Sequence, residues 1–461
     1  MSPSSAAFPA DPVLHQLPMA LDPGHMRKVF SERLADVGQR RLQVEACRVE
    51  RVRYRRGERC VLQYALSLRN AWTGLAQQRW VAAEMYPDER LQHRWRKLRA
   101  GNAQVTDARD SATGSLLTDL GMLVHFFPHD PRLPTLGPLT TAPPRQLEAA
   151  LLRGFGPGSW RAESWTTETV RYRAALGATL RYAAEAREAG SGRARWKCFY
   201  VKVYPAGGAA AGHAALAALW GRAAVRDADL SVARPIEYFP ELGAVAQEEV
   251  HGVTFEELLC HGRDPAGAAR RIGRALARFH QRDAGPNGPA APLRGRSDHV
   301  TTVHRAAQRL AWVDPGTQAE LERLAGAIAA GLEDVPLRPT HGDLKIDHVL
   351  LDADSVSVVD LDSFALGDPM MDLGSLLADM ALQRVRGRLA VDCVRPAAGA
   401  LVEGYFRHAP AQWRTRLPVC CAGATLDKAV HSFQRQQGGW RTHIRALIHE
   451  AEGLLAGRCW W

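Results

Sequence analysis

Residues 341–374 read HGDLKIDHVLLDADSVSVVDLDSFALGDPMMDLG, a stretch in which aspartates alternate with short apolar runs. Two of these runs, HVLLD and VSVVDLD, flank the turn-forming ADS and predict a β-hairpin. The hairpin would bring Asp343, which precedes it, back toward Asp360 and Asp362, which follow its second strand. Carboxylates gathered in this way can orient a reacting hydroxyl and hold a divalent ion beside phosphates. The hairpin alone does not exclude the alternative, in which these aspartates only cap turns and helices.

The stretch resembles the aminoglycoside phosphotransferase and choline kinase family, relatives of the protein kinases, in the ordered motifs HGDLKIDH, DLD and GDPMMDLG. The resemblance implies an α+β, protein-kinase-like bilobal fold with a small antiparallel β lobe and a larger helical lobe. It implies that Asp343 is the catalytic base and that Asp360 is the principal ligand of Mg²⁺ or Mn²⁺. His348 and Asp362 are implied as further metal ligands. Asp372 is implied to be structural, starting a helix and bracing the catalytic loop.

The resemblance extends from about residue 165 to the end of the chain and implies ATP as the phosphoryl donor. FYVKVYP resembles the strand whose lysine, here Lys202, holds the α- and β-phosphates. The turn RAALGA would cover the phosphates and contains the single glycine Gly177. The segment AVAQEEV resembles the hinge strand, whose backbone lies beside adenine. The residues expected there are Gln247, Glu248, Glu249 and Val250.

The sequence departs from the family pattern at three places. His348 replaces the metal-binding asparagine, and an imidazole is a softer ligand that suits Mn²⁺ better than Mg²⁺. Macrolide phosphotransferases resemble this sequence in having a histidine there. The helix predicted after Lys202 contains no glutamate to pair with the lysine, and His213 is its polar candidate besides Arg222. The phosphate-covering turn is poor in glycine.

An internal repeat precedes the catalytic stretch. VRYRRGERCVLQY begins at residue 52 and VRYRAALGATLRY at residue 170, an offset of 118 (170 − 52). The same offset places Glu84 opposite Lys202, so the first copy carries a carboxylate where phosphates would need a cation. Farther on, LGMLVHFFP and LGAVAQEEV match at an offset of 122 (242 − 120). The pattern predicts a duplicated, non-catalytic β-rich lobe before the catalytic one.

The predicted organisation follows from this repeat and from a change to helical periodicity near residue 253. The segment LPTLGPLTTAPPRQ, residues 133–146, is the predicted link between the two copies. The predicted parts are a loose lead-in at 1–39, a non-catalytic lobe at 40–145, a nucleotide-binding lobe at 160–252 and a helical lobe with the catalytic loop and acceptor site at 253–461.

The composition of the 461-residue chain, 46% hydrophobic, fits a multidomain protein with apolar cores. Its formal charge of +10 comes largely from arginine-rich stretches, but no nucleic-acid-binding motif accompanies them, so nucleic-acid binding is disfavoured. The eight scattered cysteines fit reduced thiols in the cytoplasm. No signal-peptide pattern and no run of about 18 apolar residues is found, so no membrane association is expected. The oligomeric state is left open.

These features predict a small-molecule kinase that transfers the γ-phosphoryl group of ATP to a hydroxyl of an amino sugar, a macrolide-like antibiotic, a sugar or an amino alcohol. The alternative is a catalytically impaired, pseudokinase-like binding or scaffolding protein. His348 and the glycine-poor turn favour that alternative, whereas the intact Asp343 and Asp360 favour the enzyme.

Overall fold

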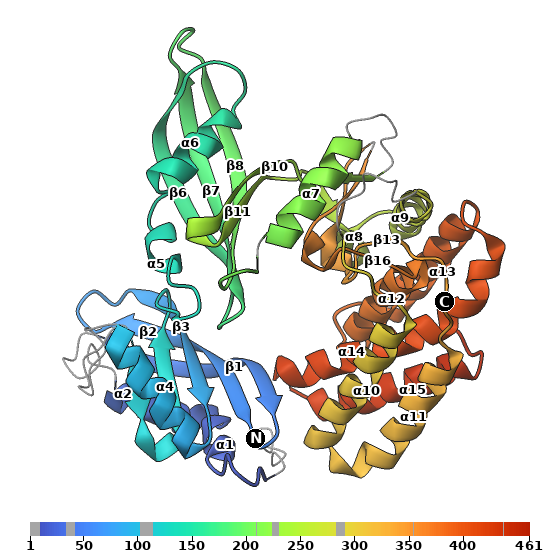
Figure 1. The fold of residues 1–461 in the computed structure, drawn as a ribbon, viewed down its shortest axis with the longest axis horizontal. Coiled ribbons are helices and arrows are strands. Elements are labelled where there is room, and N and C mark those ends of the chain that lie inside the picture. Colours follow the sequence, from blue (N-terminus) through green and yellow to red (C-terminus); the bar gives the residue numbers. More distant parts are fainter. Residues whose placement is uncertain are drawn as a thin grey trace. The chain divides into compact units, whose positions relative to one another are not determined.

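The computed structural model describes residues 10–33, 42–101, 114–208, 210–223, 230–282, 291–353, 355–436 and 438–461. It divides into two compact units, whose elements are labelled in Figure 1. Within the described residues, no helix is both long and apolar enough to cross a membrane. Unit 1 comprises Met1–Gly207, Phe239–Ala244 and Phe433–Gly438, and unit 2 comprises Gly208–Tyr238, Val245–Ser432 and Gly439–Trp461.

Unit 1 is built on antiparallel strands (Figure 1). Its first sheet has the order β1-β2-β3-β5-β4, with antiparallel pairing between all neighbours. A second set, β6, β7 and β8, pairs antiparallel in chain order. The strands are β1 Leu42–Arg55, β2 Arg59–Asn70, β3 Ala76–Met85, β4 Ser115–Leu117, β5 Met122–Phe126, β6 Trp160–Arg173, β7 Gly177–Glu188 and β8 Ala194–Val203.

The two sets of strands repeat with the spacing that the sequence indicates. Strands β1, β2 and β3 have 14, 12 and 10 residues, and β6, β7 and β8 have the same three lengths. β6 begins 118 residues after β1 (160 − 42), and the next two pairs keep this offset. The helices α4 (Asp88–Gly101) and α7 (Ala210–Ala223) both have 14 residues and begin 122 apart (210 − 88). That the first copy is a non-catalytic lobe stays a prediction.

The N-terminal segment differs from the loose lead-in predicted for residues 1–39. Its described part forms helices α1 (Leu17–Ala20) and α2 (Pro23–Arg33). The fully buried Phe30 meets Tyr64 of β2 edge to face at 5.3 Å between ring centroids. The Tyr64 hydroxyl donates a 2.7 Å hydrogen bond to the end of α1. The apolar residues of this segment therefore belong to the core of unit 1.

The predicted link at residues 133–146 joins the two copies but is not purely irregular. It contains α5 (Leu136–Leu139) and leads into α6 (Arg145–Arg153). The hydroxyl of Tyr182, on β7, donates a hydrogen bond to the carbonyl of Leu139. This bond ties the link to the second set of strands.

Unit 2 combines small sheets with helices, so the described chain is of the predicted α+β class. One sheet has the order β12-β14-β15-β9, and β13 pairs antiparallel with β16. The strands wholly in this unit are β9 Leu230–Val232, β12 Val253–Thr254, β13 Arg338–Thr340, β14 Val349–Leu351, β15 Val356–Val358 and β16 Ala365–Gly367. β10 Pro235–Phe239 and β11 Ala244–Glu248 lie in this unit except for Phe239 and Ala244, which belong to unit 1. The helices after α7 are α8 Phe255–His261, α9 Pro265–His280, α10 Arg296–Val313, α11 Gln318–Gly331, α12 Pro369–Val385, α13 Val391–Phe406, α14 Leu417–Gln434 and α15 Trp440–Leu455.

Close packing of α9 against α13 positions the end of α9. The predicted stripe of Ile272, Leu276 and Phe279 is buried. On α9, Gly273 lies so close to α13 that an added Cβ would come within 2.3 Å of the Leu401 carbonyl oxygen. Only glycine permits this approach. The packed helix ends at His280, in the centre of the unit.

Candidate active site

The predicted hairpin is present and brings two of the predicted metal ligands together. β14 and β15 pair antiparallel, and the Val359 amide donates a 3.0 Å hydrogen bond to the His348 carbonyl at the base of the hairpin. His348 Nε2 therefore lies 3.4 Å from Asp360 Oδ2. The predicted hairpin is confirmed, and the approach of Asp343 to Asp360 and Asp362 stays a prediction.

Asp372 braces the loop that carries Asp343. Its carboxylate accepts hydrogen bonds from the backbone amides of His341 (2.5 Å) and Gly342 (2.8 Å), and lies 3.2 Å from His280 Nε2. Burial alone would raise the pKa of Asp372, but the hydrogen bond to His280 and the nearby imidazoles hold that pKa below its usual value. As the resemblance implies, Asp372 is structural. However, helix α12 is capped by Asp368, and Asp372 lies in its first turn.

The two histidines of this region have structural partners. His341 Nε2 lies 2.8 Å from the Val359 carbonyl oxygen at the base of the hairpin. His280 Nδ1 lies 2.8 Å from the Tyr405 hydroxyl of α13. Both imidazoles therefore link the loop that carries Asp343 to surrounding elements.

Two lysines flank Asp343. Lys345 Nζ lies 2.5 Å from one carboxylate oxygen, and Lys428 Nζ, from α14, lies 3.5 Å from the other. Burial tends to raise the pKa of Asp343, but Lys428 and Lys345 lower it well below the usual aspartate range. A carboxylate with so low a pKa is a weak proton acceptor. Such a carboxylate is better suited to orienting a hydroxyl than to removing its proton early, and the role of Asp343 as catalytic base stays a prediction.

The His348–Asp360 pair is the part of the structure suited to a divalent ion. Burial and the charge of Lys345 lower the pKa of His348 to about 3, so its imidazole is neutral near pH 7 and able to ligate. Asp360 has a left-handed backbone (φ 66°), an uncommon conformation for a residue other than glycine. Among the described residues, no three His, Cys, Asp or Glu side chains form a ready-made metal cluster. The pair suits an ion whose other ligands are phosphate oxygens and water.

The third predicted metal ligand, Asp362, lies beside helix α7. It belongs to the short 3₁₀ helix Leu361–Ser363, which contacts α7. An added Cβ on Gly212 of α7 would lie 3.8 Å from Asp362 Oδ1. The structure thus places Asp362 against α7, and its role as a metal ligand stays a prediction.

A pocket of about 460 Å³ opens beside Asp343. Its volume is within the range of small-molecule sites. Asp427 lines it, and burial raises the pKa of this carboxyl. Lys428 also lines it and is almost fully buried. The remaining charged or histidine side chains of the lining are Arg294, Asp298, His299, Arg305, Asp368 and Asp372.

The residues predicted to bind the nucleotide lie on two different units. Gln247 and Glu248 end β11 in unit 2, and Glu249 and Val250 follow them. The Glu248 amide donates a 2.9 Å hydrogen bond to the Arg234 carbonyl. In unit 1, Lys202 lies on β8 and Gly177 begins β7. The nucleotide-binding roles of all these residues stay predictions.

Sequence reasoning missed Lys345 and Lys428 as partners of Asp343. Lys345 lies two residues after Asp343, so a signal was available in the motif itself. Lys428 is 85 residues away (428 − 343) on a different helix, and no local pattern points to it. Asp379 was also missed, although its carboxylate accepts a 3.1 Å hydrogen bond from the Ile346 amide and supports the same loop.

A braced aspartate, a neighbouring histidine–aspartate pair and an adjoining pocket are the components of a phosphoryl-transfer centre. The chain matches the family described as "Phosphotransferase enzyme family" over residues 170–414, more than half of its length. The protein therefore belongs to this phosphotransferase family, with the protein-kinase-like α+β fold that its motifs predict. A search of curated proteins found no match. The extra N-terminal lobe lies outside the matched residues.

Several solved structures are similar to this chain. A choline/ethanolamine kinase family protein from Mesorhizobium loti is 17% identical, with a TM-score of 0.41 over 59% of this chain and 84% of its own. Choline kinase from Cryptosporidium parvum is 8% identical, with a TM-score of 0.42 over 64% and 89%. An aminoglycoside-3'-phosphotransferase of type VIII is 21% identical, with a TM-score of 0.36 over 61% and 100%. The family assignment rests on the family match and not on these scores.

Family membership makes the protein a small-molecule phosphotransferase and gives no support to the alternative of a pseudokinase-like scaffold. The acceptor is not identified by this membership, nor are the roles of individual residues.

Proposed function

We propose that the protein transfers the γ-phosphoryl group of ATP to a hydroxyl of a small molecule bound in the pocket beside Asp343. The observation that carries this proposal is the ionised Asp343 carboxylate, held between Lys345 and Lys428 at the edge of a 460 Å³ pocket. Its loop is fixed by two backbone hydrogen bonds to Asp372. Such fixed positioning is the main contribution that a protein makes to phosphoryl transfer.

In this proposal the Asp343 carboxylate accepts a hydrogen bond from the hydroxyl group of the substrate to be phosphorylated. This bond directs the hydroxyl oxygen toward the γ-phosphorus of ATP. The proton passes from the hydroxyl to Asp343 late, as the bond to phosphorus forms and the bond to ADP breaks, because the low pKa of Asp343 makes it a poor base for an intact alcohol. Lys345 and Lys428 keep the carboxylate ionised and fix its orientation. They also bring positive charge toward the transferred group.

Asp360 and His348 would hold the divalent ion that the family implies, which supplies charge neutralisation for the phosphates when bound. We infer either Mg²⁺ or Mn²⁺, with Mn²⁺ favoured by the neutral imidazole.

Acceptors of the size of a sugar, an amino sugar or an amino alcohol fit the pocket better than a macrolide-like antibiotic does, because the volume beside Asp343 is modest. The pocket carries both cations and carboxylates, so an acceptor with several hydroxyl or amino groups finds partners there. A direct test incubates the protein with ATP, either metal and a panel of these acceptors, and measures ADP release and the phosphorylated product. Acceptor-dependent ADP release is expected, whereas release that no acceptor increases would contradict the proposal.

Replacing His348 with asparagine is expected to change the metal preference. An amide oxygen is a harder ligand than the imidazole, so activity with Mg²⁺ relative to Mn²⁺ should rise by several-fold. The measurement is kcat with saturating ATP at matched concentrations of each ion. An unchanged ratio would show that His348 does not ligate the ion.

Replacing Lys428 with methionine is expected to move the acid limb of activity to higher pH. Lys428 favours the ionised form of Asp343 and lowers its pKa, so removing this charge raises that pKa, by roughly one unit for a single close charge. The acid limb of kcat/KM to which Asp343 contributes should therefore begin at a higher pH in the variant than in the wild-type protein. Arg395→Met is the matched control, because Arg395 lies on α13, is exposed and does not line the pocket. If kcat/KM fell at the same acidic pH in the Lys428 variant and in the wild-type protein, the claim that Lys428 lowers the pKa of Asp343 would be contradicted.

A further inference from the structure

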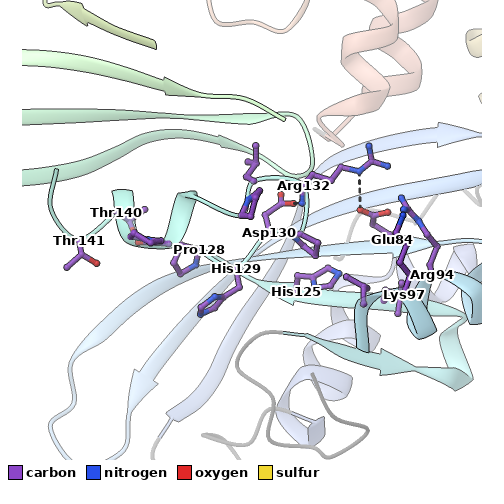
Figure 2. Close-up of a pocket in the computed structure, with 17 residues that line it drawn as sticks. Glu84, Arg94, Lys97, His125, Pro128, His129, Asp130, Arg132, Thr140 and Thr141 are labelled. Carbon is purple, nitrogen blue, oxygen red and sulfur yellow. Dashed lines mark hydrogen bonds and ion pairs between the residues drawn. The ribbon is translucent and has the colours of Figure 1, made fainter. Parts of the chain in front are cut away.

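Unit 1 contains a pocket of its own, separate from the residues assigned to phosphotransfer. Its volume is about 950 Å³, at the upper end of the range of small-molecule sites. It lies between strands β3 and β5, helix α4 and the segment from Pro128 to Thr141 (Figure 2). All the lining residues belong to unit 1.

The two carboxylates of this pocket already have protein partners. Asp130 accepts hydrogen bonds from the Tyr172 hydroxyl (2.9 Å) and from the Ala175 amide (2.7 Å). Glu84 is buried and accepts a hydrogen bond from the Tyr86 hydroxyl. These carboxylates are therefore already hydrogen-bonded within the protein, and they do not indicate which ligand the pocket binds.

The cationic side chains of the pocket have fewer protein partners than its carboxylates. Arg94 and Lys97 extend from α4 one turn apart, and Figure 2 shows both beside Glu84. Arg94 donates a 3.3 Å hydrogen bond to the Tyr86 hydroxyl and, among the described residues, forms no ion pair with Glu84 at contact distance. Arg132 Nε lies 4.0 Å from Glu84, and within the described part of the chain this buried nitrogen has no hydrogen-bond acceptor. A buried donor of this kind gains when an anionic oxygen reaches it.

The rest of the lining is largely apolar. Leu98, Leu123 and Leu133 line the pocket together with four prolines. Such surfaces favour a ligand with an apolar or ring-containing part over an inorganic ion. The prolines are Pro128, Pro131, Pro134 and Pro138.

We propose that this pocket binds a small organic anion, in which a phosphate or carboxylate is joined to an apolar, ring-containing body. The anionic group would lie among Arg94, Lys97 and Arg132, and the body would lie against the leucines and prolines. The arrangement of charge differs from that in the second copy, where the equivalent of Glu84 is Lys202. The cations here come instead from α4 and from the segment after β5. This inference goes beyond the proposed phosphotransfer and does not depend on it.

The test is calorimetric titration of phenyl phosphate and of benzoate into the full chain in the presence of a metal chelator. At least one of them should bind with a Kd of roughly 0.01–1 mM, because small anions of this size reach such affinities, and phenol should bind more weakly. Comparison of the first two shows which anionic group is preferred. No binding of either anion at about 10 mM would overturn the proposal.

Substitutions in the pocket test whether the anion binds there. Arg94→Gln and Lys97→Gln should each weaken it about tenfold, since one charged contact is worth about that much. Arg96→Gln is the matched control, because Arg96 lies on the same helix, is exposed and does not line the pocket. Lys97 is also exposed, so its variant should fold even if the Arg94 variant does not. Binding that neither pocket variant weakens, or that Lys428→Met in unit 2 abolishes, would overturn the proposal.

Discussion

The substitution Asp343→Asn is expected to lower kcat of phosphotransfer by about 10³-fold. An amide cannot accept the hydroxyl proton, and it loses the attraction of Lys345 and Lys428 that fixes the side chain. Nucleotide affinity should change little, because the metal pair His348 and Asp360 is left intact. The measurement is steady-state kinetics with the acceptor identified from the panel, together with calorimetric binding of ATP.

The control for this variant is Asp334→Asn, which removes a carboxylate at an exposed position of unit 2 outside the acceptor pocket. It should retain wild-type kcat within about twofold. An Asp343→Asn variant that keeps a tenth or more of the wild-type kcat would show that another group orients the hydroxyl.

The substitution Asp372→Ala is expected to lower the free energy of unfolding by about 3–5 kcal/mol, the usual cost of removing one partner from a buried polar network. The amides of His341 and Gly342 would lose their acceptor in the interior, and His280 would lose its carboxylate partner. The measurement is urea unfolding followed by far-UV circular dichroism, with attention to the transition of unit 2.

Asp392→Ala is the matched control for this variant. Asp392 lies in the first turn of α13, as Asp372 does in α12, but its side chain is exposed. Loss of an exposed helix-terminal carboxylate costs about 0.3–1 kcal/mol. Equal losses in the two variants would mean that the hydrogen bonds of Asp372 contribute little to stability.

The sequence was sufficient where the signal is local. The alternation and turn residues around ADS predict the hairpin that places His348 beside Asp360, and the three-to-four-residue spacing on α9 predicts its buried face. The repeat offset of 118 found in the sequence is also the offset between the first three strands of the two copies.

The sequence was insufficient where the partners come from distant elements. Lys428 reaches Asp343 only because α14 packs beside the catalytic loop, and periodicity within a helix does not reveal its neighbour. The lead-in was expected to be loose because of its prolines, yet Leu17, Met26 and Phe30 are buried, and Phe30 packs on Tyr64 of β2. The 950 Å³ pocket is formed by the packing of α4 and the segment after β5, which no single motif specifies.

The most direct test of the central claim is calorimetric titration of ATP into the wild-type protein and into Asp360→Asn, each with Mg²⁺, with Mn²⁺ and with chelator. The account predicts binding that requires a divalent ion in the wild-type protein and that is weakened by about a hundredfold in the variant, because the partly buried carboxylate proposed to hold the ion is lost. Absent binding, or binding that is indifferent to metal and to the substitution, would contradict a working phosphoryl-transfer site at Asp360 and His348.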